Sequence, residues 1–586
     1  MHRSLTALAL AGLLAPVHAL DQPEAATTRT EKQGQLAAPV KRFAVTAANP
    51  LAVDAGVDIL KAGGSAVDAA VAVQAVLGLV EPQSSGIAGG AFLLHWDGRE
   101  VQALDGRETA PAAATPGLFL KPDGKPMPIR EAISSGLSTG TPGVLAMLAE
   151  AHLRHGKLPW ARLFEPAIRL AEQGFAVSPR LNELLSGETA LRNDPIAAAY
   201  FFDAAGAPLA VGTVLKNPAY AAVLRGIAAN GVKAFYEGPV AVDIVRRVKA
   251  HARPGLLTTE DLAAYRPVVR APLCNDWRAW RICGFGPPTS GHLTLMQILG
   301  LLDTQPAARA ASAITADWMH AYAESAKLAF ADRAQFIGDP AFVTAPGGDW
   351  QNLLSLAYLR QRGALIGPRA SGIATAGNPA PVQQALAPQA DQLESGTSHI
   401  SIVDAQGHAV AMTTSVESAF GNRMMSDGGT GLAGGFVLNN QLTDFALNPV
   451  GADGKPVANR VEAGKRPRSS MAPTLVFDRK GQLLMAAGSP GGPVIIHYVA
   501  KVITGTLAWG LPVQQAVDLP NFGHFNSGSL IVENGALSAE QLADLRGRGH
   551  QVVETDLTSG LQVLLRVPGG WVGGADPRRE GVVRGQ

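Results

Sequence analysis

Residues 394–421 constrain the fold more than any other stretch, because their pattern is typical of two strands joined by a tight turn. Apolar residues alternate with polar ones over 399–403, and apolar and β-branched residues recur over 409–416. Such patterns favour strands, and Gly407 favours a turn between them. The sequence therefore predicts a β-hairpin that turns at 404–408.

The register of this hairpin brings two hydroxyl side chains together. If Asp404 faces His408 across a three-residue loop with Gly407 in the left-handed conformation, Thr397 lies opposite Ser415. Directly opposed residues lie about 4.5–5.5 Å apart at Cβ. We therefore expect the Ser415 hydroxyl to hydrogen-bond and orient the Thr397 hydroxyl.

A threonine hydroxyl is a weak nucleophile unless a base takes its proton. An N-terminal threonine supplies that base through its own α-amine, whose reference pKa is about 8. This requires a chain break between Gly396 and Thr397, and glycine suits the break because it lacks a side chain and tolerates strained backbone angles. The alternative is that Gly396-Thr397 only opens a strand, and spacing alone favours that alternative.

A second predicted hairpin turns at 478–481. Its simplest register places Ser470 opposite Ser489, next to Gly491 and Gly492. Paired hydroxyls suit an anion, and a glycine turn can direct main-chain N–H groups at a developing oxyanion. A purely structural turn is the alternative, and the local pattern alone favours it.

Composition excludes several classes of function. The chain has 586 residues, 47% hydrophobic and 17% charged, which is typical of a globular protein with ample core. Its formal net charge is +1 and it lacks a basic patch with interleaved aromatics, so we expect no nucleic-acid partner. The apolar run 5–17 follows Arg3 and ends near Ala19, which predicts a signal peptide over 1–19 and a periplasmic or secreted protein. No other apolar run is long enough for a stable membrane span.

The chain contains two cysteines, Cys274 and Cys283. In an oxidising compartment, a disulfide that closes this short stretch is the favoured interpretation. No cluster of histidine and cysteine lies beside them in the sequence, so we expect neither a metal site nor a catalytic thiol there. The Pro/Ala/Gln-rich stretch 367–393 indicates either a mobile segment leading to Gly396 or a plain linker.

Six motifs, in order, resemble the γ-glutamyltranspeptidase family of N-terminal-nucleophile hydrolases, and the likeness covers nearly the whole chain after residue 45. The motifs are Arg107-Glu108-Thr109-Ala110-Pro111, Gly396-Thr397 with His399, Asn439-Asn440-Gln441 with Asp444, Arg466-Pro467 with Ser469-Ser470, Gly488-Ser489-Pro490-Gly491-Gly492, and Asp576-Pro577-Arg578. The resemblance implies an α+β fold, a four-layer αββα sandwich made as a self-cleaving precursor. A mostly helical large subunit, 20–396, would end in a mobile segment, 367–396, and remain bound as a heterodimer to a small subunit, 397–586.

The resemblance also implies how the reactive residues act. Thr397 would attack the Gly396 carbonyl during maturation and then serve as the nucleophile, with its freed amine as base. Ser415 would support Thr397, and Gly491 and Gly492 would form the oxyanion hole. His399 and the segment 576–578 are expected to stabilise the structure.

The substrate implied by the resemblance is a γ-glutamyl amide such as glutathione or glutamine. Arg107, Ser469 and Ser470 would hold its α-carboxylate, and Gln441 and Asp444 its α-ammonium group. The acyl group would pass through a γ-glutamyl-threonine intermediate to water or to an amino acid or peptide. No metal or organic cofactor is implied, and the choice between hydrolysis and transfer stays open.

Three departures from the family pattern bear on specificity. Glu417 stands where the family usually has asparagine near the α-amine, so it would bind ammonium more strongly or indicate a different acyl group. The segment 422–435 is longer than usual, and the lid position 453–465 lacks an aromatic residue. A more open pocket is therefore expected.

Two other functions compete with this interpretation. A related cephalosporin acylase would remove a glutaryl group, which has no ammonium, so Asp444 and Glu417 argue against it. A secreted solute-binding protein would explain Arg107 and Asp444 but not the hairpin that aims Thr397 at Ser415.

Overall fold

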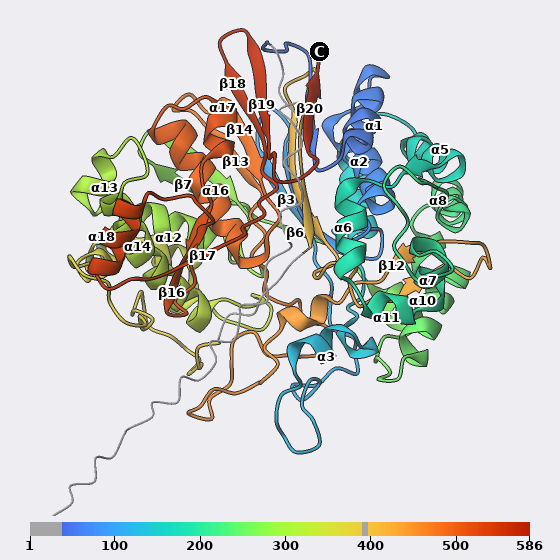
Figure 1. The fold of residues 1–586 in the computed structure, drawn as a ribbon, viewed down its shortest axis with the longest axis horizontal. Helices are drawn as coiled ribbons and strands as arrows, with labels where there is room; N and C mark the ends of the chain where they lie inside the picture. Colours follow the sequence, from blue (N-terminus) through green and yellow to red (C-terminus); the bar gives the residue numbers. More distant parts are fainter. Residues whose placement is uncertain (1–37, 390–395) are drawn as a thin grey trace, which may run out of the picture.

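Two β-sheets lie face to face at the centre of the molecule, and helices cover the outer face of each sheet (Figure 1). The computed structural model describes residues 38–389 and 396–586. The strand order is β20-β1-β9-β10-β2-β3-β6 in the first sheet and β19-β18-β14-β13-β8-β7 in the second. This arrangement confirms the predicted four-layer αββα sandwich.

Both sheets combine strands from the two predicted subunits. The first sheet contains β1 (Ala44–Ala47), β2 (Gly90–Trp96), β3 (Val101–Gly106), β6 (Val268–Arg270), β9 (Thr397–Val403), β10 (Ala409–Ser415) and β20 (Val582–Gly585). The second contains β7 (Leu273–Trp277), β8 (Trp280–Gly284), β13 (Thr474–Phe477), β14 (Leu483–Gly488), β18 (Gln562–Val567) and β19 (Gly570–Ala575). A break before Thr397 would therefore leave each sheet held together by hydrogen bonds between the two products.

The central hairpin β9–β10 is buried on both faces, because one face meets helices and the other meets the second sheet. Ile400 and Ile402 pack in the core beneath α1 (Pro50–Lys61) and α2 (Ala66–Val80), whereas Val403 packs in the core between the sheets. Side chains alternate along a strand, so Thr397 shares the face of Val403. The predicted nucleophile thus points toward the second sheet.

The two outer layers are mostly helical. The layer over the first sheet includes α1, α2, α4 (Val144–His155), α5 (Glu165–Gln173), α6 (Pro179–Gly187), α7 (Pro195–Phe201), α8 (Pro218–Asn230) and α10 (Gly238–Ala250). The layer over the second includes α12 (Gly291–Asp303), α14 (Ala316–Phe336), α15 (Leu356–Gly363), α16 (Ile495–Ile503), α17 (Val513–Asp518) and α18 (Ala539–Gly547). Within residues 38–389 and 396–586, no helix has both the length and the apolarity needed to cross a bilayer.

The second hairpin, β13–β14, differs from its predicted register. Thr474 pairs with Ala487, and a β-bulge between Val476 and Phe477 shifts the strands. The predicted pairing of Ser470 with Ser489 is therefore wrong, because the turn pairs Asp478 with Gln482 instead of Gly481 and the bulge shifts the register by one more residue.

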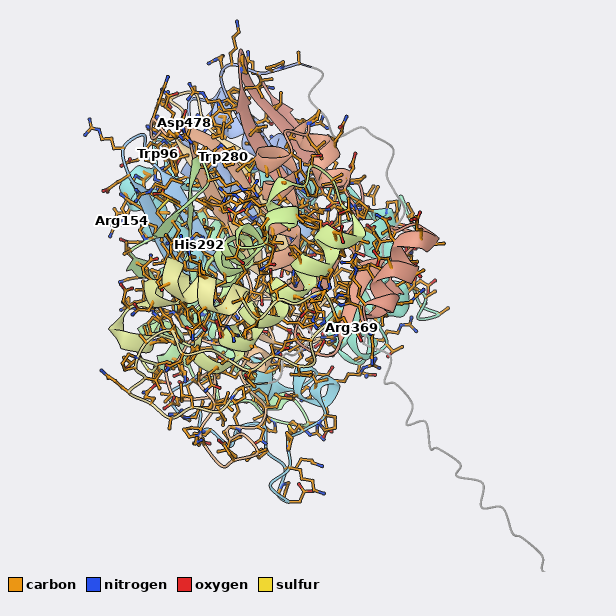
Figure 2. All side chains as sticks on the ribbon, turned by 90° about the vertical axis from the view of Figure 1, so that its left-hand side faces the viewer. Trp96, Arg154, Trp280, His292, Arg369 and Asp478 are labelled. Atoms are coloured by element: carbon orange, nitrogen blue, oxygen red, sulfur yellow. A yellow bond between two sulfur atoms is a disulfide. The ribbon has the colours of Figure 1, made fainter. Side chains whose placement is uncertain are left out.

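The disulfide hairpin lies at the edge of the second sheet. Cys274 of β7 pairs with Cys283 of β8, and their sulfur atoms are bonded. At the end of this hairpin, Trp280 lies near Asp478, and Trp96 of the first sheet lies close by (Figure 2).

Two sequence predictions concern segments that the structure covers in part or not at all. The predicted signal peptide 1–19 and residues 390–395 lie outside the described residues. The described part of the predicted mobile segment, 367–389, has no helix or strand, but Ala370 N–H donates to the Arg548 carbonyl and Gly377 N–H donates to Asp332. Its mobility stays a prediction.

Candidate active site

The predicted pairing of Thr397 with Ser415 is confirmed. Thr397 begins β9, Ser415 ends β10, and the two residues are directly opposed in the ladder. Their hydroxyl oxygens lie 3.1 Å apart, and both residues are buried. The turn chemistry around Gly407 therefore sets the register that joins the two hydroxyls.

The Ser415 hydroxyl also contacts the peptide bond before Thr397. It donates a hydrogen bond to the carbonyl oxygen of Gly396 at 2.6 Å and accepts one from the backbone N–H of Glu417 at 2.9 Å. A serine hydroxyl has only one hydrogen to donate, so the Thr397 hydroxyl must donate to Ser415. Ser415 thus orients the threonine oxygen and polarises the adjacent carbonyl together.

Gly396 adopts a backbone conformation that other residues avoid. Its φ is +107°, and a Cβ at this position would lie 2.8 Å from the carbonyl oxygen of Glu417. Both the positive φ and the close backbone approach require glycine.

Arg579 contacts the predicted nucleophile, Thr397, and sequence reasoning missed this contact. Its Nη1 donates to the main-chain carbonyl of Thr397 at 3.0 Å. Arg579 directly follows the predicted 576–578 motif, where Asp576 accepts from Arg578 at 3.2 Å and from the backbone N–H of Leu561. The residue that donates to the Thr397 carbonyl is thus Arg579, the neighbour of the motif.

Arg107 and Asp444, predicted to bind opposite ends of one substrate, form a buried ion pair with each other. Arg107 follows β3, and its guanidinium also donates to the carbonyls of Pro467 and Arg468 at 3.1 and 3.0 Å. The side chains of Arg107 and Asp444 are 1% and 2% exposed. Because the carboxylate and ammonium of an α-amino acid share one carbon, adjacent opposite charges suit such a group.

Two acceptor atoms next to this pair have no hydrogen-bond partner. Gln441 Nε2 donates to Asp444 Oδ2 at 2.7 Å, which leaves Asp444 Oδ1 and Gln441 Oε1 buried and unbonded in the described structure. A buried acceptor without a donor is destabilising by about 1–3 kcal/mol. An ammonium group, which has only donors, would satisfy both atoms.

Glu417 has a strained backbone, with φ of +81°, and a fully buried carboxyl group. Its Oε2 accepts from the Asn440 side chain and from Ser418 Oγ, the latter at 2.7 Å. Burial and the neighbouring Asp444 carboxylate raise the pKa of Glu417 well above that of an exposed glutamate. Sequence reasoning assigned no role to Asn440, whose side-chain amide donates to the Glu417 carboxylate in the structure.

Ser469 and Ser470 lie in a network that contains another arginine missed from the sequence. Arg333 of α14 donates to the Ser470 hydroxyl and to the Ser290 hydroxyl, both at 2.8 Å. The Ser469 hydroxyl accepts from the Met471 N–H at 3.1 Å. Since Arg333 comes from a helix more than 130 residues earlier in the chain, no local motif could indicate this contact.

Gly491 and Gly492 form the turn between β14 and the helical segment that ends in α16. Their φ values are +130° and +56°. At the end of β14, Gly488 lies against the His399 ring, since a Cβ on Gly488 would lie 2.2 Å from that ring. The diglycine turn thus begins three residues after Gly488, which contacts β9 through His399. Ser489 donates to the Pro490 carbonyl, so it takes no part in a serine pair.

Glu108, next to Arg107, is a further buried carboxyl group with no assigned role. Neither of its oxygens has a hydrogen-bond partner in the described structure, and Arg107 Nη1 is 4.0 Å away. Burial raises the pKa of Glu108 to about 8, against the opposing effect of Arg107.

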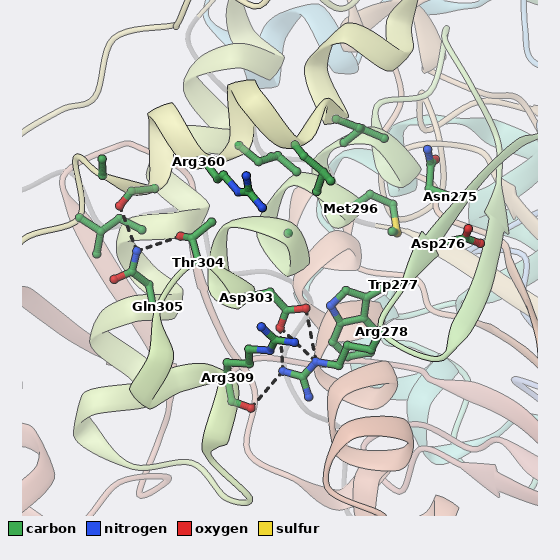
Figure 3. Close-up of a pocket in the computed structure, with 17 residues that line it drawn as sticks. Asn275, Asp276, Trp277, Arg278, Met296, Asp303, Thr304, Gln305, Arg309 and Arg360 are labelled. Carbon is green, nitrogen blue, oxygen red and sulfur yellow. Dashed lines mark hydrogen bonds and ion pairs between the residues drawn. The ribbon is translucent and has the colours of Figure 1, made fainter.

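A cavity of about 930 Å³ lies elsewhere, between the disulfide hairpin, α12 and α15 (Figure 3). In it, Arg278 is paired with Asp303, and Arg309 and Arg360 lie nearby. It includes none of the predicted site residues. The hydrogen-bond geometry around Thr397, and not cavity size, therefore locates the candidate active site.

The αββα sandwich and the threonine hydroxyl at the start of a central strand define an N-terminal-nucleophile hydrolase. A family model described as gamma-glutamyltranspeptidase matches residues 52–586. The chain belongs to the γ-glutamyltranspeptidase family.

Individual relatives agree with this assignment over most of their length. The chain is 35% identical to a glutathione hydrolase proenzyme of Escherichia coli K12, covering 92% of this chain and 90% of that one. It is 34% identical to a glutathione hydrolase proenzyme of Bacillus subtilis 168, covering 92% and 91%. A solved cephalosporin acylase from Bacillus halodurans superposes with a TM-score of 0.81 at 27% identity, covering 95% of this chain and 98% of that one.

Proposed function

We propose that this protein is a γ-glutamyl transferase and hydrolase that matures by cutting its own chain between Gly396 and Thr397. The observation that carries the proposal is the Ser415 hydroxyl, which joins the Thr397 hydroxyl to the Gly396 carbonyl. The family assignment and the proenzyme names of the relatives support the same conclusion.

In the proposed maturation, Thr397 Oγ1 attacks the carbonyl carbon of Gly396. The hydrogen bond from Ser415 stabilises the negative charge that develops on the carbonyl oxygen. The C–N bond then breaks, and the nitrogen takes up the proton that the hydroxyl has lost. This leaves Gly396 as an ester on Thr397 Oγ1 and releases the Thr397 amine. Water then hydrolyses the ester, which yields a Gly396 carboxylate and a free N-terminal Thr397.

The freed amine would then act as the base for turnover. It takes the proton of the Thr397 hydroxyl, which attacks the γ-carbonyl of the substrate and displaces the amine product. Gly491 and Gly492 are proposed to donate main-chain N–H groups to the oxyanion. Water or the amine of an amino acid or peptide then releases the γ-glutamyl group. No metal or organic cofactor takes part in these steps.

Recognition of the γ-glutamyl group is proposed to use the Arg107–Asp444 pair. The substrate α-carboxylate would replace Asp444 as a ligand of Arg107, together with Ser469 and Ser470. The α-ammonium group would donate to the unbonded oxygens of Asp444 and Gln441, with Glu417 nearby. The Arg107–Asp444 ion pair would then be replaced by two pairs, Arg107 with the α-carboxylate and Asp444 with the α-ammonium group. Neither buried side chain would be left without an opposite charge.

The second candidate is a glutaryl-removing acylase, and the superposition on the cephalosporin acylase favours it. A glutaryl group lacks the ammonium, so it would leave Asp444 Oδ1 and Gln441 Oε1 without donors. The buried acceptors thus support the γ-glutamyl substrate over the glutaryl one.

The proposal includes export and a two-subunit product. The apolar run before residue 19 supports removal of a signal peptide and a periplasmic or secreted location. Residues 20–396 and 397–586 would remain a heterodimer because both sheets draw strands from both parts.

A direct test compares matched chromogenic γ-glutamyl and glutaryl anilides with the purified protein, with and without a dipeptide acceptor. The proposal predicts faster anilide release from the γ-glutamyl compound, and none from Thr397→Ala. A preference for the glutaryl compound would favour the acylase. Binding of glutamate without turnover in a chain that stays uncleaved would favour a solute-binding protein.

A further inference from the structure

Three metal-ligating side chains meet in the outer helical layer, away from the candidate active site. His320 and Glu324 lie one helical turn apart on α14, and His550 lies between α18 and β17 (Gln551–Thr555). The helices α14 and α18 pack against each other (Figure 1). One ligand atom from each of the three residues lies within 4.8 Å of the other two.

The two histidine rings face each other through nitrogen atoms. His320 Nδ1 and His550 Nε2 are 2.8 Å apart, and both residues are only 5% exposed. His320 Nε2 lies 2.8 Å from the Gly367 carbonyl, and only a protonated nitrogen can donate to a carbonyl. The Nδ1 lone pair of His320 therefore accepts a hydrogen bond from His550 Nε2–H. His320 is in the tautomer that a metal-bound histidine with a carbonyl partner adopts, and a bound metal would take the place of the His550 proton.

Glu324 is also held in place by a second set of contacts. Its Oε2 accepts from the Ser371 N–H at 3.1 Å, and its Oε1 lies 2.6 Å from Lys327 Nζ. Lys327 donates in turn to the Ser371 carbonyl at 2.6 Å. The Lys327 charge opposes a cation, so a bound ion has to rely on the two imidazoles. Nitrogen ligands favour zinc-type transition metals, whereas calcium and magnesium require oxygen.

We propose that His320, Glu324 and His550 form a binding site for a divalent transition-metal ion of the zinc type. The site needs no cleavage, because its geometry is present in the uncleaved chain. Its consequence rests on the proposed cleavage: His320 and Glu324 belong to the part before Gly396 and His550 to the part after it. A bound ion would then link the two subunits.

A metal at the same site would also stabilise the beginning of the segment 367–396, which leads to the proposed cleavage position. Gly367 and Ser371 contact the ligands His320 and Glu324 through their backbones. Arg369, between them, lies on the face of the molecule shown in Figure 2. A bound metal would thus fix the start of this segment, at Gly367 and Ser371.

The test uses full-length protein stripped of metal by a chelator and titrated with Zn²⁺ and Co²⁺. We expect one Co²⁺ per chain, with visible d–d absorption, and a higher Tm with Zn²⁺. His550→Gln and His320→Gln should weaken binding by at least about tenfold. His251→Gln, which changes a histidine on another helix terminus, should bind as the wild type does.

Thr397→Ala separates this proposal from the proposed function. It should bind the metal as tightly as the wild type, since all three ligands are present in the uncleaved chain. The proposal is overturned if Co²⁺ gives no d–d absorption, or if His550→Gln binds Zn²⁺ as well as wild type. Circular dichroism and the metal-free Tm of each variant establish that it is folded, so weaker binding reports on the ligands.

Discussion

The Ser415 hydroxyl donates a 2.6 Å hydrogen bond to the carbonyl oxygen of Gly396 while it accepts one from the Thr397 hydroxyl, which lies 3.1 Å away. One side chain thus holds both the proposed nucleophile and the bond proposed to be cut. Because Ser415 cannot act as a strong base, its effect must come from orientation and from stabilising charge on the carbonyl oxygen.

Replacing this hydroxyl should slow self-cleavage. Ser415→Ala removes the donor to the Gly396 carbonyl, and loss of one such donor typically slows a reaction by about 10²–10³-fold. Ser415→Thr keeps the hydroxyl and should retain most of the rate. The measurement is the time course of fragment appearance from freshly purified precursor. Equal rates for the alanine variant and wild type would show that the hydrogen bond has no part in cleavage.

A methyl group at Gly396 should disturb both folding and cleavage. Gly396→Ala combines a positive φ with a Cβ 2.8 Å from the Glu417 carbonyl oxygen. Gly510→Ala is the matched control, because Gly510 also has a positive φ, +69°, but open space around its Cβ position. Strained backbone is destabilising by about 1–3 kcal/mol. Denaturant unfolding should show this loss in both variants, and only Gly396→Ala should slow cleavage.

The ammonium-binding assignment of Asp444 predicts a substrate-selective effect. Asp444→Asn should lower kcat/KM for a γ-glutamyl anilide by about 10²-fold. The variant removes one charge of the ion pair with the substrate ammonium, and losing one partner of such a buried pair weakens binding by about 2–5 kcal/mol. For the glutaryl anilide the loss should be less than about tenfold. Asp453→Asn, an exposed residue in the predicted lid, serves as control. Equal losses on both substrates would remove Asp444 from ammonium recognition.

Glu108 should make the stability of the protein depend on pH. Its pKa is raised from 4.5 to about 8 by burial, so between these values the native state binds more protons than the unfolded state. Stability should then fall as pH rises from about 4.5 to about 8, by up to about 1.4 kcal/mol per pH unit from this group, and no further above that range.

The comparison that isolates this effect is Glu108→Gln against wild type in urea unfolding from pH 5 to pH 9. Glutamine does not titrate, so the variant should gain stability relative to wild type as pH rises and then keep a constant difference above about pH 8. Glu540→Gln, on the exposed first turn of α18, should leave the wild-type profile unchanged. If the stability of Glu108→Gln instead differed from that of wild type by a constant amount from pH 5 to pH 9, Glu108 would be ionised over that whole range and the prediction would be wrong.

The pairing of Thr397 with Ser415 could be predicted from a local pattern, whereas the four-layer fold was implied by the resemblance to the γ-glutamyltranspeptidase family. The Asp404–His408 turn determines the β9–β10 register, and alternation along the strands determines which side chains face the second sheet. The β13–β14 register was missed because the turn is one residue longer than predicted and a bulge adds another residue without a sequence signature.

The remaining site contacts come from residues far apart in the chain. Arg333 reaches Ser470 across 137 positions, and Arg579 reaches the Thr397 carbonyl across 182. Neither contact follows from periodicity or spacing, since it depends on how the two sheets and their helices pack. The ion pair between Arg107 and Asp444 was missed for the same reason, although both residues were predicted to bind substrate.

The most direct test of the account is intact mass and N-terminal sequencing of the purified protein beside Thr397→Ala. The account predicts two wild-type fragments, the smaller beginning Thr397-Ser398-His399, and a single chain in the variant. A single unbroken wild-type chain would contradict it, because no free Thr397 amine would then exist to act as the base.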